Sequence, residues 1–397
     1  MRRAVARRDD TGVQPAAGGA NASAAGSMPP LWHAARMTEA TVGTGMAPAD
    51  ITLDLGDLHP SGHGALRLRC RLDGDHVVSA DPEPGLLHRG AEKLLEAREY
   101  RQALMLANRH DWLGAAVSEV ALATAIEELL GLQVPSRAVW LRTLLVEITR
   151  ASAALLHLAG AVTMPPRGVP VAGAPGIAAR EAWLGCLETM TGGRVHPMVT
   201  RIGGLAIDAP DGWGEQIQHA IDVTREAVPV ILDALTRTVP ADIAVMDRSS
   251  AVRWSVGGPV ARASGLDEDL RRDAPSLAYA DLSDVLRVIT SEQGDALTRY
   301  QVLAEQVLAD LDVIAACWAR VPSGPVDVRL PKVVRAPEGS AYAVLESAMG
   351  PSGAYVVSTG GVTPWRVRLR TSSYANVQAM GAALPGTPLV DLATAVG

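Results

Sequence analysis

The chain is organised around LHPSGHG (residues 58–64), LHRGAEK (87–93) and NRHDW (108–112), three stretches of polar, titratable residues set between apolar segments. The first contains Pro60 and Gly62, which favour a tight turn over a helix. The second opens a segment with helical periodicity, and the third closes it. Histidine, arginine and aspartate grouped in this way indicate a functional site rather than a solvated surface.

The composition is that of a globular protein with a sizeable core. The 397 residues are 48% hydrophobic and 20% charged, and the formal net charge is −7, which argues against a general nucleic-acid binder. The three cysteines, Cys70, Cys186 and Cys317, lie far apart in the sequence. This spacing excludes a Cys-x-x-Cys metal or redox site, argues against a disulfide framework and fits a reducing compartment.

Residues 1–47 are rich in Ala, Gly, Ser and Thr and show no periodicity, so we expect a disordered extension. Met37 or Met46 could equally be the true start. No apolar run reaches the roughly 18–20 residues that span a bilayer, and no signal-peptide segment follows the N-terminal arginines. Any membrane contact is therefore expected to be peripheral or to occur through partners.

The secondary-structure pattern places β segments on both sides of a helical centre. Residues 65–72 alternate apolar and basic side chains and predict, with a turn at 73–74, a hairpin with 76–80. Helices are predicted at 115–130, from 136 onward, at 179–190, at 213–237 and at 295–318, with a loop at 161–178 and an interruption or end near Pro229. Short strands are predicted at 342–346, 354–358 and 366–370.

These elements predict an α+β fold with a disordered extension, 1–47, and one domain, 48–397. The domain would consist of an N-terminal β part at 48–84, a helical core at 85–335 and a C-terminal β part at 336–397. The helix at 295–318 repeats apolar residues at steps of three and four, as in a helical bundle.

Taken one at a time, the polar motifs have plain structural explanations. His59 and His63 are four residues apart, but Pro60 removes the helix that would direct both at one metal. The charges after His88 suit a solvated helix start. Residues 109–111 could combine a base with its orienting carboxylate, although neighbouring residues point in different directions on a helix. Phosphate-loop, dinucleotide and nucleophile-elbow motifs are missing, so we predict no nucleotide site in this chain.

At these same residues the chain resembles the 49-kDa-type subunit (the D-type subunit) of respiratory complex I, NADH-quinone oxidoreductase. The family's His-Pro-Ser-x-His-Gly-x-Leu-Arg-Leu stands at 59–68, and its Gly-x-x-His-Arg-Gly-x-Glu-Lys stands at 85–93. Related pieces follow in the same order at 100–111, 191–196, 201–204, 294–300 and 364–368. The similarity covers roughly residues 50–397.

The resemblance implies a fold similar to the large subunit of nickel–iron hydrogenases. The metal-binding cysteines of those enzymes are missing, because Asp111 and Gly114 stand at the matching place. The ligand count therefore excludes hydrogenase chemistry, and no metal site is expected in this chain.

The resemblance also implies a role in a complex. Quinone would enter a cavity between this protein and a small iron–sulfur partner (the B-type subunit), and electrons from NADH would arrive through clusters held by partners. A C-type subunit and a membrane-arm subunit are the other expected partners in this hetero-oligomer. The chain would lie peripherally on the cytoplasmic side of the cell membrane, without nucleic acid, and would take part in quinone reduction and proton translocation.

The same resemblance assigns candidate site residues. His63 matches the family's quinone-head histidine, and Trp112 stands where the family has a tyrosine, so these two are the catalytic candidates. His59, Arg109 and Asp111 would belong to the quinone cavity and its environment.

Arg89 and His196 match residues beside the partner's cluster. Three departures leave alternatives open: Trp112 itself, a Pro-rich loop near Met164 without the expected acid, and an end at Gly397 earlier than the family's usual end. The chain could be a non-catalytic scaffold or assembly paralogue, or a subunit of a related complex that uses another electron donor.

Overall fold

The computed structural model of the chain describes residues 49–54, 59, 66–163 and 173–397. The extension expected to be disordered, the histidine His63 and the Pro-rich loop after Met164 lie outside these described residues. The architecture below therefore concerns the domain that begins at residue 49.

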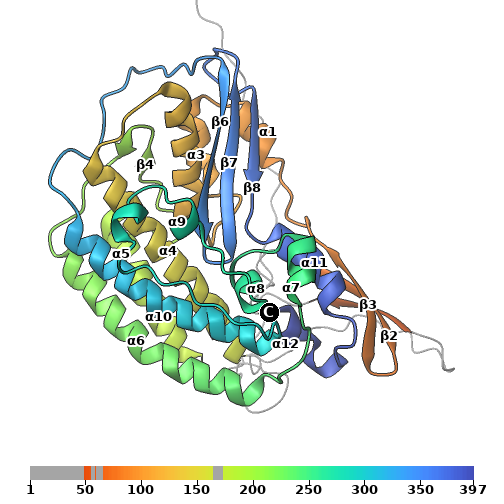
Figure 1. Ribbon diagram of the computed structural model, residues 1–397. Coiled ribbons are helices and arrows are strands. Elements are labelled where there is room, and N and C mark those ends of the chain that lie inside the picture. The colour runs from red at the N-terminus through yellow and green to blue at the C-terminus, as the bar shows by residue number, and fades with distance from the viewer. Residues whose placement is uncertain (1–48, 55–58, 60–65, 164–172) are drawn as a thin grey trace, which may run out of the picture. The chain divides into compact units, whose positions relative to one another are not determined.

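Four long helices from the middle of the chain pack together on one side of this domain (Figure 1). They are α4 (Ser136–Thr163), α5 (Ala174–Thr191), α6 (Trp213–Thr238) and α10 (Ala296–Arg320). Helix α4 packs against α5, α5 packs against α6, and α10 packs against both α4 and α6. The predicted bundle helix is confirmed as α10, and Asp295 caps its start by accepting a 2.8 Å hydrogen bond from the Thr298 N–H.

Two details of the helical prediction are wrong. Helix α6 continues through Pro229 to Thr238, because Val228 and Ile231 bury the surrounding turns in the core and tertiary packing offsets the proline's local cost. The loop expected at 161–178 is too long at both ends, since α4 extends to Thr163 and α5 begins at Ala174. Pro175, in the first turn of α5, suits a helix start.

A three-stranded antiparallel sheet confirms the predicted C-terminal strands. It contains β6 (Gly339–Ser347), β7 (Gly350–Ser358) and β8 (Arg366–Arg370) in that order. Helix α3 (Ala115–Leu130) covers one face, where Ala341, Ala343 and Leu345 alternate inward. Helix α3 ends at Gly131, whose φ of 61° makes it the expected C-cap.

The predicted hairpin is also confirmed, as β2 (Arg67–Asp73) and β3 (His76–Glu83), with β1 (Ala49–Asp54) pairing on β2. The end of the chain runs along this sheet: the Gly386 N–H donates to the Val77 carbonyl at 2.7 Å. Helix α11 (Tyr374–Ala383) packs on β3, and η3 (Leu389–Asp391) and α12 (Leu392–Val396) follow. These helices after β8 were not predicted from the sequence.

Short elements connect the layers. They are α1 (Ala91–Glu96), α2 (Tyr100–Ala107), β4 (Thr200–Arg201), β5 (Gly204–Leu205), α7 (Arg248–Trp254), α8 (Gly258–Ala263), α9 (Leu270–Asp273) and η2 (Tyr279–Leu282). The domain thus consists of helices from the middle of the chain, one sheet from its N-terminal part and one sheet from its C-terminal part. This arrangement confirms the α+β fold class.

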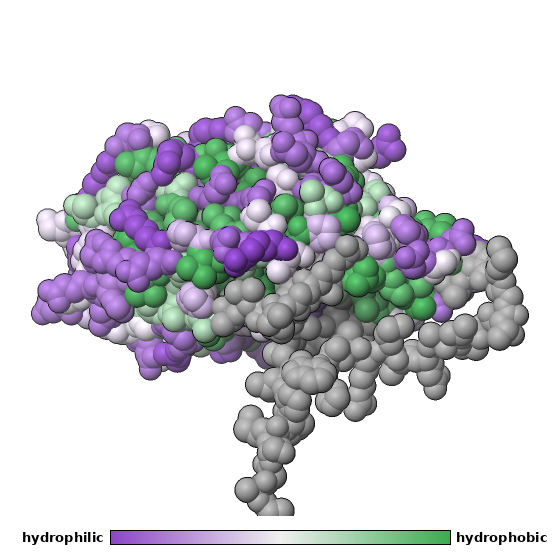
Figure 2. Space-filling view, turned by 90° about the horizontal axis from the view of Figure 1, so that it is seen from below, coloured by the Kyte–Doolittle hydropathy of each residue, from purple (hydrophilic) through white to green (hydrophobic). Residues whose placement is uncertain are grey.

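Among the described residues, α4 alone is long and apolar enough to cross a membrane. Most of that helix is buried inside the domain, as expected of a core helix in a globular fold. On the surface, Figure 2 shows apolar patches interspersed with hydrophilic ones on the face that it presents. Large exposed apolar side chains include Leu87 (57% exposed), Trp365 (69%) and Tyr374 (63%).

Candidate functional site

A junction rich in arginine lies where α2 leads into α3. The Arg89 guanidinium donates from Nη2 to the Arg109 backbone carbonyl at 2.6 Å. Arg109 in turn places its Nη2 3.4 Å from the Met198 sulfur, and Arg201 donates to the Met198 carbonyl at 2.8 Å. Arg109 therefore connects the segment of Arg89 to the segment of Met198 and Arg201, and all three arginines are exposed.

His196 belongs to the same junction. Its side chain is half-buried, and burial lowers the pKa of the imidazole, with Arg109 lowering it further. A neutral imidazole beside these cations can accept or donate one hydrogen bond at each ring nitrogen according to its tautomer. The structure thus brings together three predicted site residues, Arg89, Arg109 and His196.

A buried carboxylate that the sequence analysis missed holds this junction to α3. Glu119 is completely buried and its Oε1 accepts the Met198 N–H at 2.8 Å and the Asn108 side-chain amide. Burial raises the pKa of Glu119, against hydrogen bonds led by that of Asn108. The available signal was an acidic residue inside an otherwise apolar helix, because a buried carboxylate requires nearby donors.

Asp111 closes a turn ahead of α3. Its Oδ1 accepts the Gly114 N–H at 3.0 Å, and a Cβ atom on Gly114 would lie 2.8 Å from Oδ2. His110 instead pairs its Nδ1 with the Ala107 carbonyl at 2.7 Å. The base–carboxylate pair considered for residues 109–111 is therefore not formed, and His110 and Asp111 each bond to a different backbone group.

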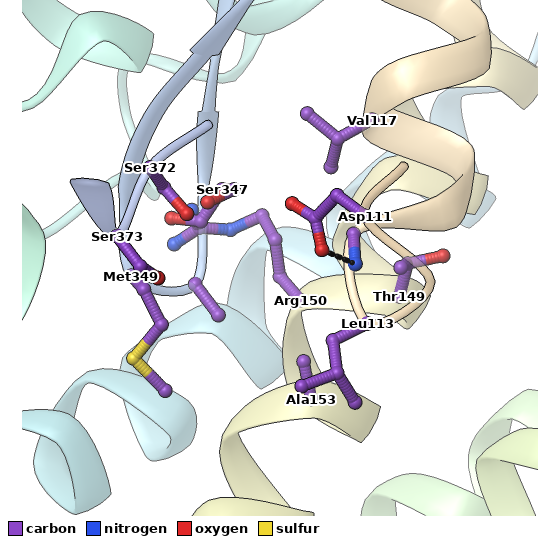
Figure 3. Close-up of a pocket in the computed structure, with 12 residues that line it drawn as sticks. Asp111, Leu113, Val117, Thr149, Arg150, Ala153, Ser347, Met349, Ser372 and Ser373 are labelled. Carbon is purple, nitrogen blue, oxygen red and sulfur yellow. Dashed lines mark hydrogen bonds between the residues drawn. The ribbon is translucent and has the colours of Figure 1, made fainter. Parts of the chain in front are cut away.

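Asp111 also lines a pocket between α3, α4 and the β6–β7 turn (Figure 3). Arg150 and Ser347 line it from the other side. The cavity volume is about 60 Å³, which admits a few water molecules at roughly 10–15 Å³ each. The described side chains alone therefore leave space for a few water molecules there and for no larger ligand.

Trp112 lines a second, smaller pocket with Arg180 and Arg194. The two pockets share Leu113, Thr149 and Ala153, so Asp111 and Trp112 face adjoining hollows on either side of Leu113. The two predicted residues therefore lie on one shallow strip of surface.

His59 contacts the C-terminal segment and lines neither of these two pockets. Its side chain is 3% exposed, and its Nε2 lies 2.7 Å from the Ala393 carbonyl, which ties it to the C-terminal segment. His63, the other histidine of the same sequence motif, lies outside the described residues, so its relation to Trp112 and Asp111 stays a prediction.

The part of the chain that the structure describes contains no group of three or more His, Cys, Asp or Glu side chains placed to hold a metal. Its cysteines are buried and free, and burial raises the pKa of Cys70 to about 11 and of Cys186 to about 12. Burial therefore favours the protonated form of these thiols.

Comparison with solved structures defines the class of protein. The fold matches a chain in the structure of the membrane-bound sulfane sulfur reductase, an archaeal respiratory membrane complex, with a TM-score of 0.81 and 31% sequence identity. The match covers 89% of this chain and 96% of that chain. The architecture is therefore that of a subunit of a respiratory membrane complex.

Comparison of sequences gives the family. The model of the family described as "Respiratory-chain NADH dehydrogenase, 49 Kd subunit" matches residues 174–336 and 330–397. The D 2 subunit of NADH-quinone oxidoreductase from Streptomyces griseus is 45% identical over 373 residues, covering 91% of this chain and 94% of the relative. The D 1 subunit of the Streptomyces coelicolor enzyme is 44% identical over 371 residues, covering 91% and 96%. The chain belongs to the 49-kDa subunit family of respiratory-chain NADH dehydrogenase.

Membership confirms the resemblance drawn from the motifs, and the protein is therefore one subunit of an oxidoreductase complex. The hydrogenase-like α+β fold is confirmed with it. The roles of the individual side chains stay predictions.

Proposed function

We propose that this chain forms one wall of a quinone cavity in an NADH-quinone oxidoreductase and lies against a partner that holds an iron–sulfur cluster. The observation that supports this most is the strip on which Asp111 and Trp112 line adjoining, open hollows. A wall that needs a second surface to become a cavity suits a site shared between subunits.

The chemistry of quinone reduction takes up two electrons and two protons. The described cysteines belong to no group of side chains placed to hold a metal, so in this proposal the electrons would come from a cluster of the partner. His63 would donate a hydrogen bond and a proton to the quinone head, because a histidine titrates near neutral pH. The Trp112 indole N–H can donate a hydrogen bond to a carbonyl oxygen but delivers no proton at physiological pH.

The arginine junction would face the partner's cluster. Positive charge at Arg89 and Arg109, with His196 beside them, would favour the more negative reduced cluster and raise its reduction potential. Asp111 would belong to the cavity wall, and His59 would anchor its own segment to the C-terminal segment through the Ala393 carbonyl.

The arrangement in the cell follows from the same proposal. The partners would be a small iron–sulfur protein of the B type, a C-type subunit and a membrane-arm protein at the quinone entrance. The chain would be peripheral, on the cytoplasmic side of the membrane, and the complex would couple electron transfer from NADH to proton translocation.

The test is the activity of the assembled complex with His63→Ala, measured in membranes as NADH-driven reduction of short-chain benzoquinone and naphthoquinone analogues. We expect activity with the quinones to be lost while NADH-driven reduction of ferricyanide persists. His219→Ala, an exposed histidine on α6, is the matched control and should retain full activity. Full quinone reductase activity in the His63 variant would refute the role of His63.

A second candidate function is a scaffold or assembly protein that keeps the fold and the partner interface without quinone chemistry. Trp112 favours it, because an indole replaces the phenol that the family resemblance leads one to expect. Purified complex that contains the iron–sulfur partner yet reduces no quinone would support this candidate.

A further inference from the structure

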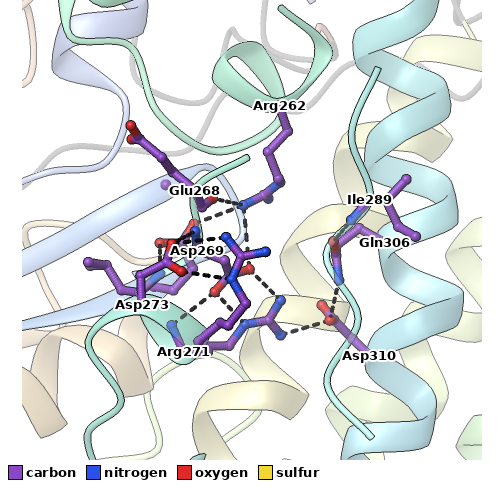
Figure 4. Close-up of polar contacts among 12 residues, drawn as sticks. Arg262, Glu268, Asp269, Arg271, Asp273, Ile289, Gln306 and Asp310 are labelled. Carbon is purple, nitrogen blue, oxygen red and sulfur yellow. Dashed lines mark hydrogen bonds and ion pairs between the residues drawn. The ribbon is translucent and has the colours of Figure 1, made fainter. Parts of the chain in front are cut away.

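A buried cluster of charged side chains connects helices and strands that are far apart in the sequence (Figure 4). Its members are Arg150 and Glu147 of α4, Arg262 of α8, Arg271 of α9 with Asp269 at the N-cap, Asp310 of α10 and Glu346 of β6. Each of these side chains is at most 6% exposed. The cluster therefore lies in the interior and is shielded from solvent.

The charges of the cluster do not balance if every group is ionised. Its three arginines cannot lose their protons, whereas its four carboxyls can bind one. An uncompensated charge in the interior is costly, and a titratable group then takes up a proton instead. Tyr279, which also faces the cluster, is neutral, and Asp273 at the exposed end of α9 pairs with Arg272. One carboxyl of the cluster is therefore expected to be protonated.

Two of the carboxylates are held firmly in the ionised form. Asp269 accepts three N–H groups of Arg271 at 2.7–3.0 Å. Asp310 accepts from Arg271, Arg150 and Gln306 at 2.7–3.0 Å. Burial alone would raise their pKa values, but the arginines outweigh it and lower the pKa of both.

Glu147 is held less closely. It accepts the Tyr279 hydroxyl at 2.6 Å, while its contacts with Arg271 and Arg150 are 3.3 Å long. The Tyr279 hydroxyl is neutral, but the hydrogen bond that it donates is stronger when Glu147 is ionised and so stabilises the carboxylate form. Glu147 thus accepts one short hydrogen bond, from Tyr279, in addition to its contacts with the guanidinium groups of Arg271 and Arg150.

Glu346 receives the least stabilisation of the four. Its contacts are Arg262 Nη1 at 3.2 Å and the Leu270 N–H at 3.4 Å. Arg262 Nε and Nη2 are buried and find no hydrogen-bond partner in the described part of the chain. Burial raises the pKa of Glu346, against the opposing effect of Arg262. The weakest hydrogen bonding and the raised pKa both identify Glu346 as the protonated carboxyl.

Arg150 connects this cluster to the pocket beside Asp111. It lines the pocket, and its guanidinium donates to the backbone carbonyls of Glu346 at 3.0 Å and Ser347 at 2.6 Å. The same guanidinium binds Asp310 at 3.0 Å. Negative charge in the pocket would therefore interact with Arg150, the same cation that stabilises the carboxylates of the cluster.

We propose that the cluster is a binding site for a single proton, carried on Glu346, and that Arg150 couples this proton to charge in the pocket. When the pocket becomes more negative, the cluster retains its proton more strongly. The coupling rests on the proposed quinone function, whereas the protonation of Glu346 does not.

The experiment is infrared difference spectroscopy of the purified, assembled complex at neutral pH. The wild-type spectrum minus that of Glu346→Gln should contain the C=O stretch of a buried carboxylic acid, shifted by exchange into D₂O. The matched variant Glu147→Gln should leave this band in place. The proposal would be overturned if the wild-type minus Glu346→Gln spectrum lacked this band. It would also be overturned if the band disappeared in the Glu147→Gln variant instead.

A second measurement on the unmodified complex tests the coupling and needs no variant to fold. Reduction with NADH in the presence of a short-chain quinone should shift or change the intensity of the Glu346 band. An unchanged band during turnover would overturn the coupling. A complex that shows the band but reduces no quinone would keep the proton on Glu346 while refuting the proposed function, so the two failures are distinguishable.

Discussion

The Arg89 guanidinium donates a 2.6 Å hydrogen bond to the backbone carbonyl of Arg109, which lies twenty residues further along the chain. The bond fixes one exposed cation beside another at the end of α2. Because Arg109 also contacts Met198, the bond orients the whole junction around His196. Arg89 therefore contributes positive charge to the surface that we propose to face the partner's iron–sulfur cluster, and it also fixes the position of Arg109 on that surface.

Replacing Arg89 with Met should lower the reduction potential of the partner's cluster, since removal of a nearby cation disfavours the more negative state. We expect a shift on the order of tens of millivolts, measured by redox titration of the assembled complex with electron paramagnetic resonance. Arg101→Met is the matched control, because Arg101 is an exposed cation that donates to the Pro331 carbonyl at 2.7 Å. Equal potentials in both variants would contradict the proposed position of Arg89.

Replacing Gly114 with Ala should disturb the Asp111 turn. The new Cβ would lie 2.8 Å from Asp111 Oδ2, so the carboxylate must shift, and the shift weakens its hydrogen bond with the Gly114 N–H. We expect a loss of about 1–3 kcal/mol in the free energy of unfolding, measured by urea denaturation of the purified chain. Gly185→Ala on α5 has open space around the new Cβ and should instead stabilise the chain by about 0.5–1 kcal/mol. Similar stabilities for the two variants would show that the Asp111 turn adapts freely.

The helices and strands could be predicted because periodicity and local signals agree there. Gly131 ends α3 with a positive φ, and Asp295 starts α10, both as short-range rules require. Pro229 misled the prediction, because the packing of α6 depends on residues distant in sequence. The predicted side chains of the junction became one site only through contacts such as that of Arg109 with Met198, and spacing along the chain cannot show such contacts.

Glu119 illustrates the same limit in the core. A carboxylate within an apolar helix signals buried donors, but nothing in the sequence identifies Asn108 and the Met198 N–H as those donors. The charge cluster that shares Arg150 with the pocket is similar, since its members come from residues 147 to 346 and no local pattern connects them.

Replacing Glu119 with Ala should destabilise the chain by about 2–4 kcal/mol, because the Asn108 amide and the Met198 N–H lose their buried acceptor. The loss should be smaller for Glu119→Gln, which keeps one acceptor oxygen. Thermal unfolding of the purified chain provides the measurement. Glu128→Gln, on the exposed side of the same helix, is the control and should change little.

The pH dependence of the same variants gives an independent check. Burial raises the pKa of Glu119, so the folded chain binds more protons than the unfolded chain between the ordinary pKa of a glutamate and the raised value. The contribution of Glu119 to stability is therefore present at low pH and is lost as the pH rises through the raised pKa. Glu119→Gln should remove this slope and Glu128→Gln should keep it; a slope that survives in the Glu119 variant would assign it to another group.

Replacing Trp112 with Tyr should separate the two proposed functions. A phenol can both donate a hydrogen bond and, with an ordinary pKa near 10, exchange a proton, whereas an indole N–H only donates. If the strip beside Leu113 is a quinone wall, Trp112→Tyr should raise the rate of quinone reduction severalfold in the assembled complex, and Trp112→Phe, which lacks the donor, should lower it. Trp365→Tyr, a change at a highly exposed tryptophan, should have no effect. Equal rates in all three variants would contradict a quinone contact at Trp112, and zero rates throughout, with the iron–sulfur partner still bound, would favour the scaffold.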